Sequence, residues 1–260
     1  MENTSNLLNT KKIILTGLMM ALVTIATMIL MVPVPFTNGY IHLGDSMIFL
    51  SVLILGWRYG AVASGVGSAL ADIFSGYVQW APWTLCIKGL MALLMGLAIE
   101  KCINSKKNII WLSLATAGFW VVFNMAIKYI INYQAATNAA ALMSEDVPDA
   151  SALEAFINGV QSQLMIAALL IPVFLIIIAI YIRKKEHLVI PVYQILGMTL
   201  AGLWMVFGYY IAGGLLYGNF AVSAFSVPWN MVQFVLGFLI AALVTAALLK
   251  TPARKYFTYN

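Results

Sequence analysis

Long apolar runs separated by short polar segments extend along this chain from residue 13 to residue 249. Their length predicts membrane-spanning helices, because a helix needs about 20 apolar residues to cross the hydrocarbon core of a bilayer. We therefore expect an all-α integral membrane protein. The expected spans are residues 13–31, 46–57, 61–74, 84–99, 109–131, 164–182, 193–217 and 228–249.

The second and third runs are each too short to cross a bilayer alone. Arg58, Tyr59 and Gly60 join them. They form either one short or tilted hairpin, or segments partly buried in the bundle. Short, glycine-interrupted apolar segments can mark the binding site of a transporter.

The composition also indicates a membrane protein. Hydrophobic residues make up 63% of the 260 residues and charged residues 9%, whereas a soluble domain has about 25% charged residues. We expect one transmembrane domain, residues 1–260, in the lipid bilayer of the plasma membrane. The net charge of +5 requires no nucleic-acid partner, because Lys and Arg lie mostly at span ends, as the positive-inside rule expects.

The basic residues also predict the orientation. With a cytoplasmic N-terminus, every Lys and Arg except Lys88 and Lys128 falls in a cytoplasmic segment. An even number of spans returns the C-terminus to the cytoplasm. The polar segment 132–162 then becomes an extracellular loop, within which residues 150–160 can form a short amphipathic helix. Its acidic residues are Glu145, Asp146, Asp149 and Glu154.

Three ionisable residues, Asp45, Asp72 and Lys88, lie within apolar sequence. Each costs about 2.5–3.5 kcal/mol in a membrane, so such residues usually pair or serve a site. The orientation places them in the outer half of the membrane, and this predicts an outward-facing pocket. The same half holds Lys128, Tyr209, Tyr210, Asn230 and Gln233.

These three charged residues can equally have a purely structural role. Asp45 stands where a carboxylate can cap a helix N-terminus. Asp72 and Lys88 can form a buried ion pair that ties short helices together. His42, in the preceding loop of residues 32–44, is a surface, capping or solute-binding residue.

An aromatic segment, residues 75–83, precedes the fourth span. It contains Gln79, Trp80 and Trp83. Such a segment is typical of an interfacial aromatic belt, or it forms a stacking surface over a planar ligand.

The sequence contains no HExxH, GxSxG or P-loop motif. We therefore expect no enzyme activity, no metal site and no cofactor. In the first span, Gly17, Ala21 and Thr24 form a face of small residues. Such a face either packs within the bundle or docks on a separate membrane subunit.

Four segments resemble a known family: YIHLGDSMIFLSVLILGWRYGAVASGVGSALADI, WAPWTLCIKGLMALLMGL, LGMTLAGLWMVFGYYIAGGLLYG and VPWNMVQFVLGFLIAAL. They are similar to the S components of energy-coupling factor (ECF) transporters, most of all to the riboflavin-type S-component family. The resemblance covers about residues 10–101 and 193–250.

The resemblance implies a six-helix bundle that binds a vitamin-like solute with high affinity. It implies docking through helix 1, here Gly17 and Ala21, on a transmembrane T subunit that carries two ATPases. Residues 103–190 then look like two extra helices inserted between the fourth and fifth core helices. The residues implied at or beside the solute site are Asp45, Asp72, Lys88, Asn230 and Gln233.

We therefore expect the substrate-capture subunit of an ATP-driven ECF importer. A vitamin B6 compound or hydroxymethylpyrimidine is favoured, and riboflavin and a queuosine precursor stay open. The alternative is a stand-alone, proton-coupled carrier of a small aromatic solute, with Asp72 and Lys88 as its proton relay.

Overall fold

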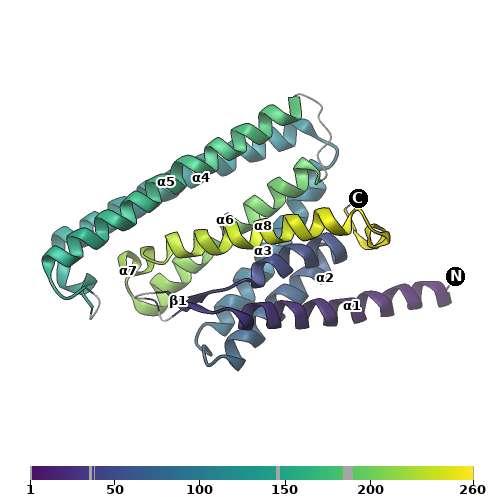
Figure 1. Cartoon of the computed structure of the whole chain (residues 1–260), viewed down its shortest axis with the longest axis horizontal. Coiled ribbons are helices and arrows are strands. Elements are labelled where there is room, and N and C mark those ends of the chain that lie inside the picture. Colours follow the sequence, from purple (N-terminus) through teal and green to yellow (C-terminus); the bar gives the residue numbers. More distant parts are fainter. Residues whose placement is uncertain (1, 35–36, 38, 145–146, 184–189, 260) are drawn as a thin grey trace.

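The computed structural model describes residues 2–34, 37, 39–144, 147–183 and 190–259. Over these residues helices make up most of the chain, and one short β-hairpin accompanies them (Figure 1). Seven helices, counting α7 and α8 as one, are long and apolar enough to cross a membrane. The helices are α1 (Glu2–Ile29), α2 (Gly44–Phe74), α3 (Ala81–Cys102), α4 (Lys106–Thr137), α5 (Ala150–Arg183), α6 (Val192–Tyr217), α7 (Phe220–Ala224) and α8 (Val227–Leu248), with 3₁₀ turns η1 (Ala139–Leu142) and η2 (Pro252–Tyr256).

Helix α2 reverses direction inside its own length. Gly56 has φ 77° and ψ 170°, a backbone conformation that glycine adopts at little cost. The hydroxyls of Ser51 and Ser64 lie 3.1 Å apart, whereas 13 residues of continuous helix would separate them by about 20 Å. The predicted second and third runs are therefore two antiparallel halves of a hairpin. Its turn lies at Gly56, earlier than the predicted connection at residues 58–60.

The two ends of the chain lie at the same end of the bundle (Figure 1). The Lys11 ammonium group is 4.6 Å from the centre of the Tyr256 ring, and that of Lys12 is 5.8 Å from the Tyr59 ring. Seven straight crossings would place the two ends on opposite sides. The reversal in α2 supplies the additional change of direction.

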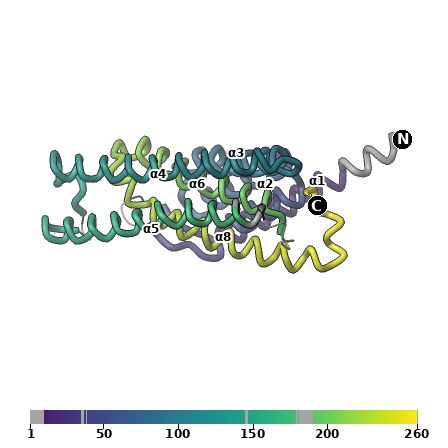
Figure 2. The backbone as a smooth tube through the Cα atoms, turned by 90° about the horizontal axis from the view of Figure 1, so that it is seen from above, coloured from purple at the N-terminus to yellow at the C-terminus, as the bar shows by residue number. Residues whose placement is uncertain are grey.

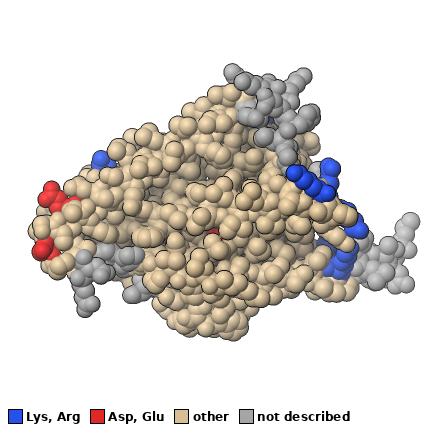
Figure 3. Space-filling model, viewed as in Figure 1, with Lys and Arg blue, Asp and Glu red and all other residues tan. Residues whose placement is uncertain are grey.

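Charge follows the same axis. Figure 3 shows Lys and Arg gathered mostly near the chain ends, and Asp and Glu mostly at the far end. This is the segregation that the sequence predicts. Glu145, Asp146, Lys184 and Lys185 lie outside the described residues.

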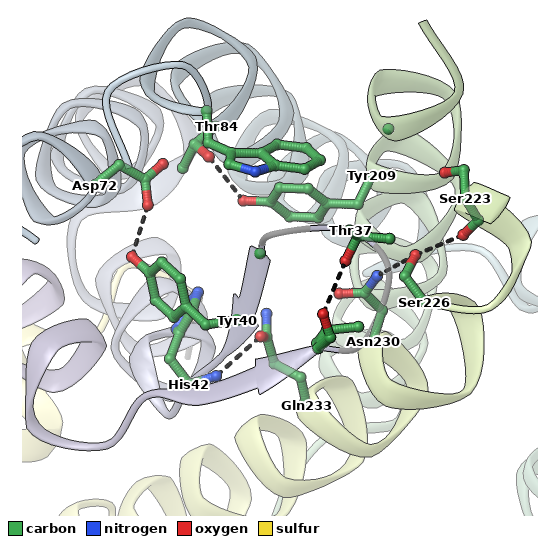
Figure 4. Close-up of a pocket in the computed structure, with 14 residues that line it drawn as sticks. Thr37, Tyr40, His42, Asp72, Thr84, Tyr209, Ser223, Ser226, Asn230 and Gln233 are labelled. Atoms are coloured by element: carbon green, nitrogen blue, oxygen red, sulfur yellow. Dashed lines mark hydrogen bonds between the residues drawn. The ribbon is translucent and has the colours of Figure 1, made fainter. Parts of the chain in front are cut away.

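A two-stranded hairpin replaces part of the loop expected at residues 32–44. Strands β1 (Val32–Val34) and β2 (Gly39–Ile41) pair antiparallel, with Pro33 opposite Tyr40. Strands of three residues are too short for a hydrophobic period to reveal. The hairpin matters for function because it carries Tyr40 and His42 toward the cavity described below (Figure 4).

Helices α4 and α5 form a long pair beside the rest of the bundle and extend past it at the acidic end (Figures 1 and 2). Gln161 donates a hydrogen bond to Asn132 (2.6 Å), and the Trp120 indole donates one to the Ala167 carbonyl (3.0 Å). The long loop expected over residues 132–162 is wrong. Helix α4 continues to Thr137, and residues 150–160 are the start of α5, because no Pro or interior break separates them from the apolar run.

Candidate functional site

A cavity lies where the β-hairpin meets the bundle (Figure 4). Figure 1 shows this hairpin at the end of α1 opposite the chain termini. Its walls come from the hairpin, α2, α3, α6, α7 and α8, and no described residue of α1, α4 or α5 lines it. The lining residues are Val34, Thr37, Gly39, Tyr40, His42, Asp72, Trp80, Thr84, Tyr209, Gly213, Ser223, Ser226, Asn230 and Gln233.

The cavity is narrow. Its empty volume is about 490 Å³, solvent at its mouth included, but the centre of a water molecule fits into only about 40 Å³ of it. Pockets that hold small ligands usually have about 300–1,000 Å³. The space open in this structure is far smaller than that, so a small ring compound fits only if the lining side chains move apart.

Beneath the cavity lies a buried ion pair. Lys88 of α3 donates to Oδ1 of Asp45, in the first turn of α2, and both side chains are fully buried. The Gln233 amide donates to the other Asp45 oxygen (3.0 Å), while its own oxygen accepts from the backbone N–H of His42 (3.0 Å). These contacts tie α2, α3, α8 and the hairpin together. The partner of Lys88 is thus Asp45, and the expected Asp72–Lys88 ion pair is wrong.

Asp72 lies near the end of α2 and faces the cavity. Its Oδ1 accepts a hydrogen bond from the Tyr40 hydroxyl (2.6 Å). Burial and the neighbouring Asp72 carboxylate raise the pKa of Tyr40 far above its usual range, so Tyr40 remains a donor. The other oxygen, Oδ2, is buried and has no hydrogen-bond partner among the described residues.

His42 is buried, with 6% of its surface exposed. Its Nδ1 accepts from the backbone N–H of Gly44 (3.0 Å), so the ring proton is on Nε2. Burial, reinforced by the Lys88 charge and opposed by Asp45, lowers the pKa of His42 to about 3. The imidazole is therefore neutral at physiological pH.

Aromatic rings form one wall. The centre of the Trp80 ring lies 5.8 Å from that of Tyr209 and 6.0 Å from that of Tyr217. Tyr217 donates to the backbone carbonyl of Thr37, and the hydroxyls of Tyr209 and Thr84 share a hydrogen bond (3.1 Å). Fixed rings of this kind offer flat apolar surface together with hydroxyl groups, which suits a planar, polar-edged ligand.

Short polar side chains form the wall beside α7. The Ser226 hydroxyl donates to the Ser223 carbonyl (2.8 Å), and the Asn230 amide donates to the Ser226 hydroxyl (3.4 Å). Ser223 donates to the Tyr210 carbonyl (2.7 Å). This wall is therefore rigid through local hydrogen bonds.

The structure brings most of the predicted site residues together. Six of them line the cavity: His42, Asp72, Trp80, Tyr209, Asn230 and Gln233. Asp45 and Lys88 lie below it. Gln79 is exposed and Trp83 is half-buried, and neither lines the cavity.

Sequence reasoning missed Tyr40, Thr84, Ser223 and Ser226 as lining residues. Thr84 stands one helical turn before Lys88, so a search for polar residues on the same face of α3 would have found it. Tyr40 lies in a three-residue strand, Ser223 in a five-residue helix and Ser226 just after that helix, and these elements are too short for a period to indicate direction. Across the described part of the chain, no group of three His, Cys, Asp or Glu side chains is placed to hold a metal ion.

Comparison with known proteins identifies the family. Residues 7–175, well over half of the chain, match the family model described as ECF-type riboflavin transporter, S component. The chain belongs to this family. It is therefore a membrane transport protein, and the family indicates a non-enzymatic role.

The matched range has one consequence for the proposed insertion. It extends from residue 7 to residue 175, a range that includes α4 and most of α5 and ends before α6. The S-component match therefore does not separate α4 and α5 from the family core. The late segments of residues 193–250, which also resemble the family, lie outside the match.

Two kinds of curated relative are similar to parts of the chain. An uncharacterized protein in the gap 3' region of Pyrococcus woesei is 46% identical over 74 residues, covering 28% of this chain and 49% of that protein. A UPF0397 protein of Streptococcus agalactiae (serotype Ia) is 31% identical over 105 residues, covering 38% of this chain and 57% of the relative. The chain thus spans about half the length of the curated relatives it matches. No solved structure matches the chain significantly.

Proposed function

We propose that this S component captures a vitamin-like small molecule in the cavity described above and delivers it through an ATP-driven ECF importer. The observation that carries the proposal is the cavity itself. It combines one unpaired acidic oxygen, from Asp72, with the aromatic wall of Trp80 and Tyr209, at the end of the bundle away from the basic residues. Family membership supports a capture role.

The proposed topology places both chain ends in the cytoplasm and the cavity toward the outside. It has eight crossings: six core segments, two of them the halves of α2, plus the pair α4 and α5. The shared end of the two termini and the basic residues gathered there support it. The cavity supports α4 and α5 as additions to the core, since no described residue of either helix lines it.

The proposed partners are a transmembrane T subunit and two ATPase subunits. Gly17 and Ala21 are exposed on α1, and a Cβ atom at Gly17 would meet nothing within 4 Å. Thr24, the third residue of the predicted face, instead turns to α2 and donates to the Gly67 carbonyl (2.8 Å). Gly17 and Ala21 therefore form the exposed part of the small-residue face, which we assign to docking.

The docking proposal is tested by co-purification with the T subunit. Ala21→Leu should abolish capture of the T subunit without changing thermal stability, because Ala21 is exposed on α1. Leu18→Ala, a change on the same exposed side, is the matched control. Normal co-purification of Ala21→Leu would refute this docking face.

The solute is proposed to be a small aromatic vitamin or precursor, with vitamin B6 compounds and hydroxymethylpyrimidine favoured over riboflavin and a queuosine precursor. Purified protein, stripped of ligand, is titrated with this panel while tryptophan fluorescence is recorded. Saturable quenching that disappears in Trp80→Phe supports capture at this cavity. Quenching that persists in Trp80→Phe but disappears in Trp83→Phe places the site elsewhere.

A proton-coupled carrier is the competing function. Its proposed relay needs Asp72 and Lys88 to exchange a proton, but Lys88 is held by Asp45 and Tyr209. Uptake in vesicles that lack any ATPase subunit, driven by a pH gradient alone, would establish the carrier. Uptake that requires ATP and the partner subunits supports the importer.

A further inference from the structure

Asp72 carries the unbalanced charge of the cavity. Among the described lining residues, Asp72 is the only Asp, Glu, Lys or Arg. Lys88, the nearby cation, is neutralised by its ion pair with Asp45. His42 is neutral, and Tyr40 keeps its proton. Asp72 is therefore the one acidic group of the described cavity lining, and no lining Lys or Arg balances it.

The geometry of that carboxylate leaves one place for a ligand. Only 4% of Asp72 is exposed, so bulk water does little to solvate it. Tyr40 occupies Oδ1, and Oδ2 has no hydrogen-bond partner among the described residues. Thr84 lies within hydrogen-bonding reach of the Asp72 carboxyl group, and its hydroxyl also shares a hydrogen bond of 3.1 Å with Tyr209. In Figure 4 the carboxylate points between Tyr40 and Thr84 toward the cavity.

We propose that Asp72 is the anchor for the solute, and that the solute is a planar heteroaromatic compound carrying a cationic, hydrogen-bond-donating nitrogen. This inference rests on the proposed capture function and narrows the class of solute. Oδ2 accepts the N–H of the solute, while the ring lies against the aromatic wall of Trp80 and Tyr209. A buried acceptor left unpaired is costly, and a charged donor satisfies it best.

Asp45 and Asp72 have different roles under this proposal. Asp45 has both oxygens occupied, by Lys88 and Gln233, and does not line the cavity. Asp45 therefore holds the bundle together, whereas Asp72 is kept ready for a ligand. Neutralising the two residues should consequently have opposite effects on the ligand-free protein.

The first arm of the test needs no ligand. Thermal unfolding of the full chain in detergent is measured for wild type, Asp72→Asn and Asp45→Asn. Asp72→Asn removes an uncompensated buried charge and retains an acceptor for Tyr40, so it should unfold at the wild-type temperature or above. Asp45→Asn leaves Lys88 unpaired and should unfold at a lower temperature. A fall for Asp72→Asn equal to that of Asp45→Asn would overturn the proposal.

The second arm varies ligand charge on a constant ring. Pyridoxamine, pyridoxine and 4-pyridoxic acid carry an aminomethyl, a hydroxymethyl and a carboxylate group at one position of the same pyridine. The 4-amino and 4-oxo forms of 5-hydroxymethyl-2-methylpyrimidine make a second pair, in which the amino form has the more basic ring nitrogen and can carry a proton when it is bound by a carboxylate. The amino compound should bind tightest in at least one series, and Asp72→Asn should weaken it about 10- to 100-fold, as loss of one charged hydrogen bond does.

The outcomes distinguish this inference from the function on which it rests. An affinity that does not depend on ligand charge and is unchanged in Asp72→Asn overturns the inference and leaves the capture function standing. Binding of no compound in either series overturns the inference, and it contradicts the capture function as well if riboflavin and the queuosine precursor also fail to bind. Charge-selective binding that Asp72→Asn abolishes and Asp45→Asn merely weakens supports both.

Discussion

The buried pair of Asp45 and Lys88 gives the sharpest prediction about stability. Both side chains have 0% exposure, and each loses its counter-charge if the other is removed. Lys88→Met keeps the shape of the side chain, and the Gln233 amide still donates a hydrogen bond to the Asp45 carboxylate. Breaking one partner of a buried pair costs about 3–5 kcal/mol. We expect the lower part of that range, because Gln233 continues to stabilise the carboxylate.

Removing both charges should restore most of the loss. In Asp45→Asn/Lys88→Met the site holds no charge, and the Gln233 amide retains an acceptor. Replacement of a buried pair by neutral groups of similar volume is often neutral or stabilising. The double variant should therefore be more stable than Lys88→Met alone by about 2–4 kcal/mol.

Reversible unfolding in mixed detergent, followed by circular dichroism, measures the four corners of this double-mutant cycle. Met91→Leu, at a fully buried position of the same helix, controls for simple packing changes. If the two single losses add in the double variant, the charges do not interact, and the structural role assigned to Asp45 is refuted.

Three further predictions concern single positions. Gly56→Ala should destabilise the chain by about 1–2 kcal/mol because of its positive φ, whereas Gly118→Ala, an open helical position, should leave stability equal or improved in the same thermal assay. His42 is neutral in the folded state with a pKa of about 3 and binds a proton below about pH 6.5 when unfolded. The stability that neutral His42 contributes is thus complete above that pH and is lost as the pH falls toward 3. At pH 5 the free energy of unfolding of the wild type should have fallen by about 2 kcal/mol, a loss that His42→Asn does not show. Equal pH profiles of stability for the two proteins would contradict this. Tyr259→Phe removes a hydroxyl that donates to Glu100 (3.2 Å) and accepts from a backbone N–H in the turn of α2. Denaturant unfolding should therefore show a free energy of unfolding lower by about 1 kcal/mol. An unchanged free energy would mean that this contact does not stabilise the fold.

The sequence by itself determined the membrane class, the approximate spans and the segregation of charge. These follow from local properties, since burial of a backbone in hydrocarbon requires long apolar helices and a membrane orients Lys and Arg. It also indicated the region of the site, because ionisable residues rarely stand in apolar runs without a role. Asp72 was found in this way.

The tertiary structure alone decided which charges meet. Lys88 lies 43 positions from Asp45 and 16 from Asp72, yet it pairs with Asp45. Spacing along the chain carries no information on this choice, because the reversal at Gly56 and the packing of α3 set the distances. The same holds for Tyr40, which reaches Asp72 through a hairpin of three-residue strands. The cavity therefore depends on contacts between segments far apart in the chain, and such contacts leave no local period to read.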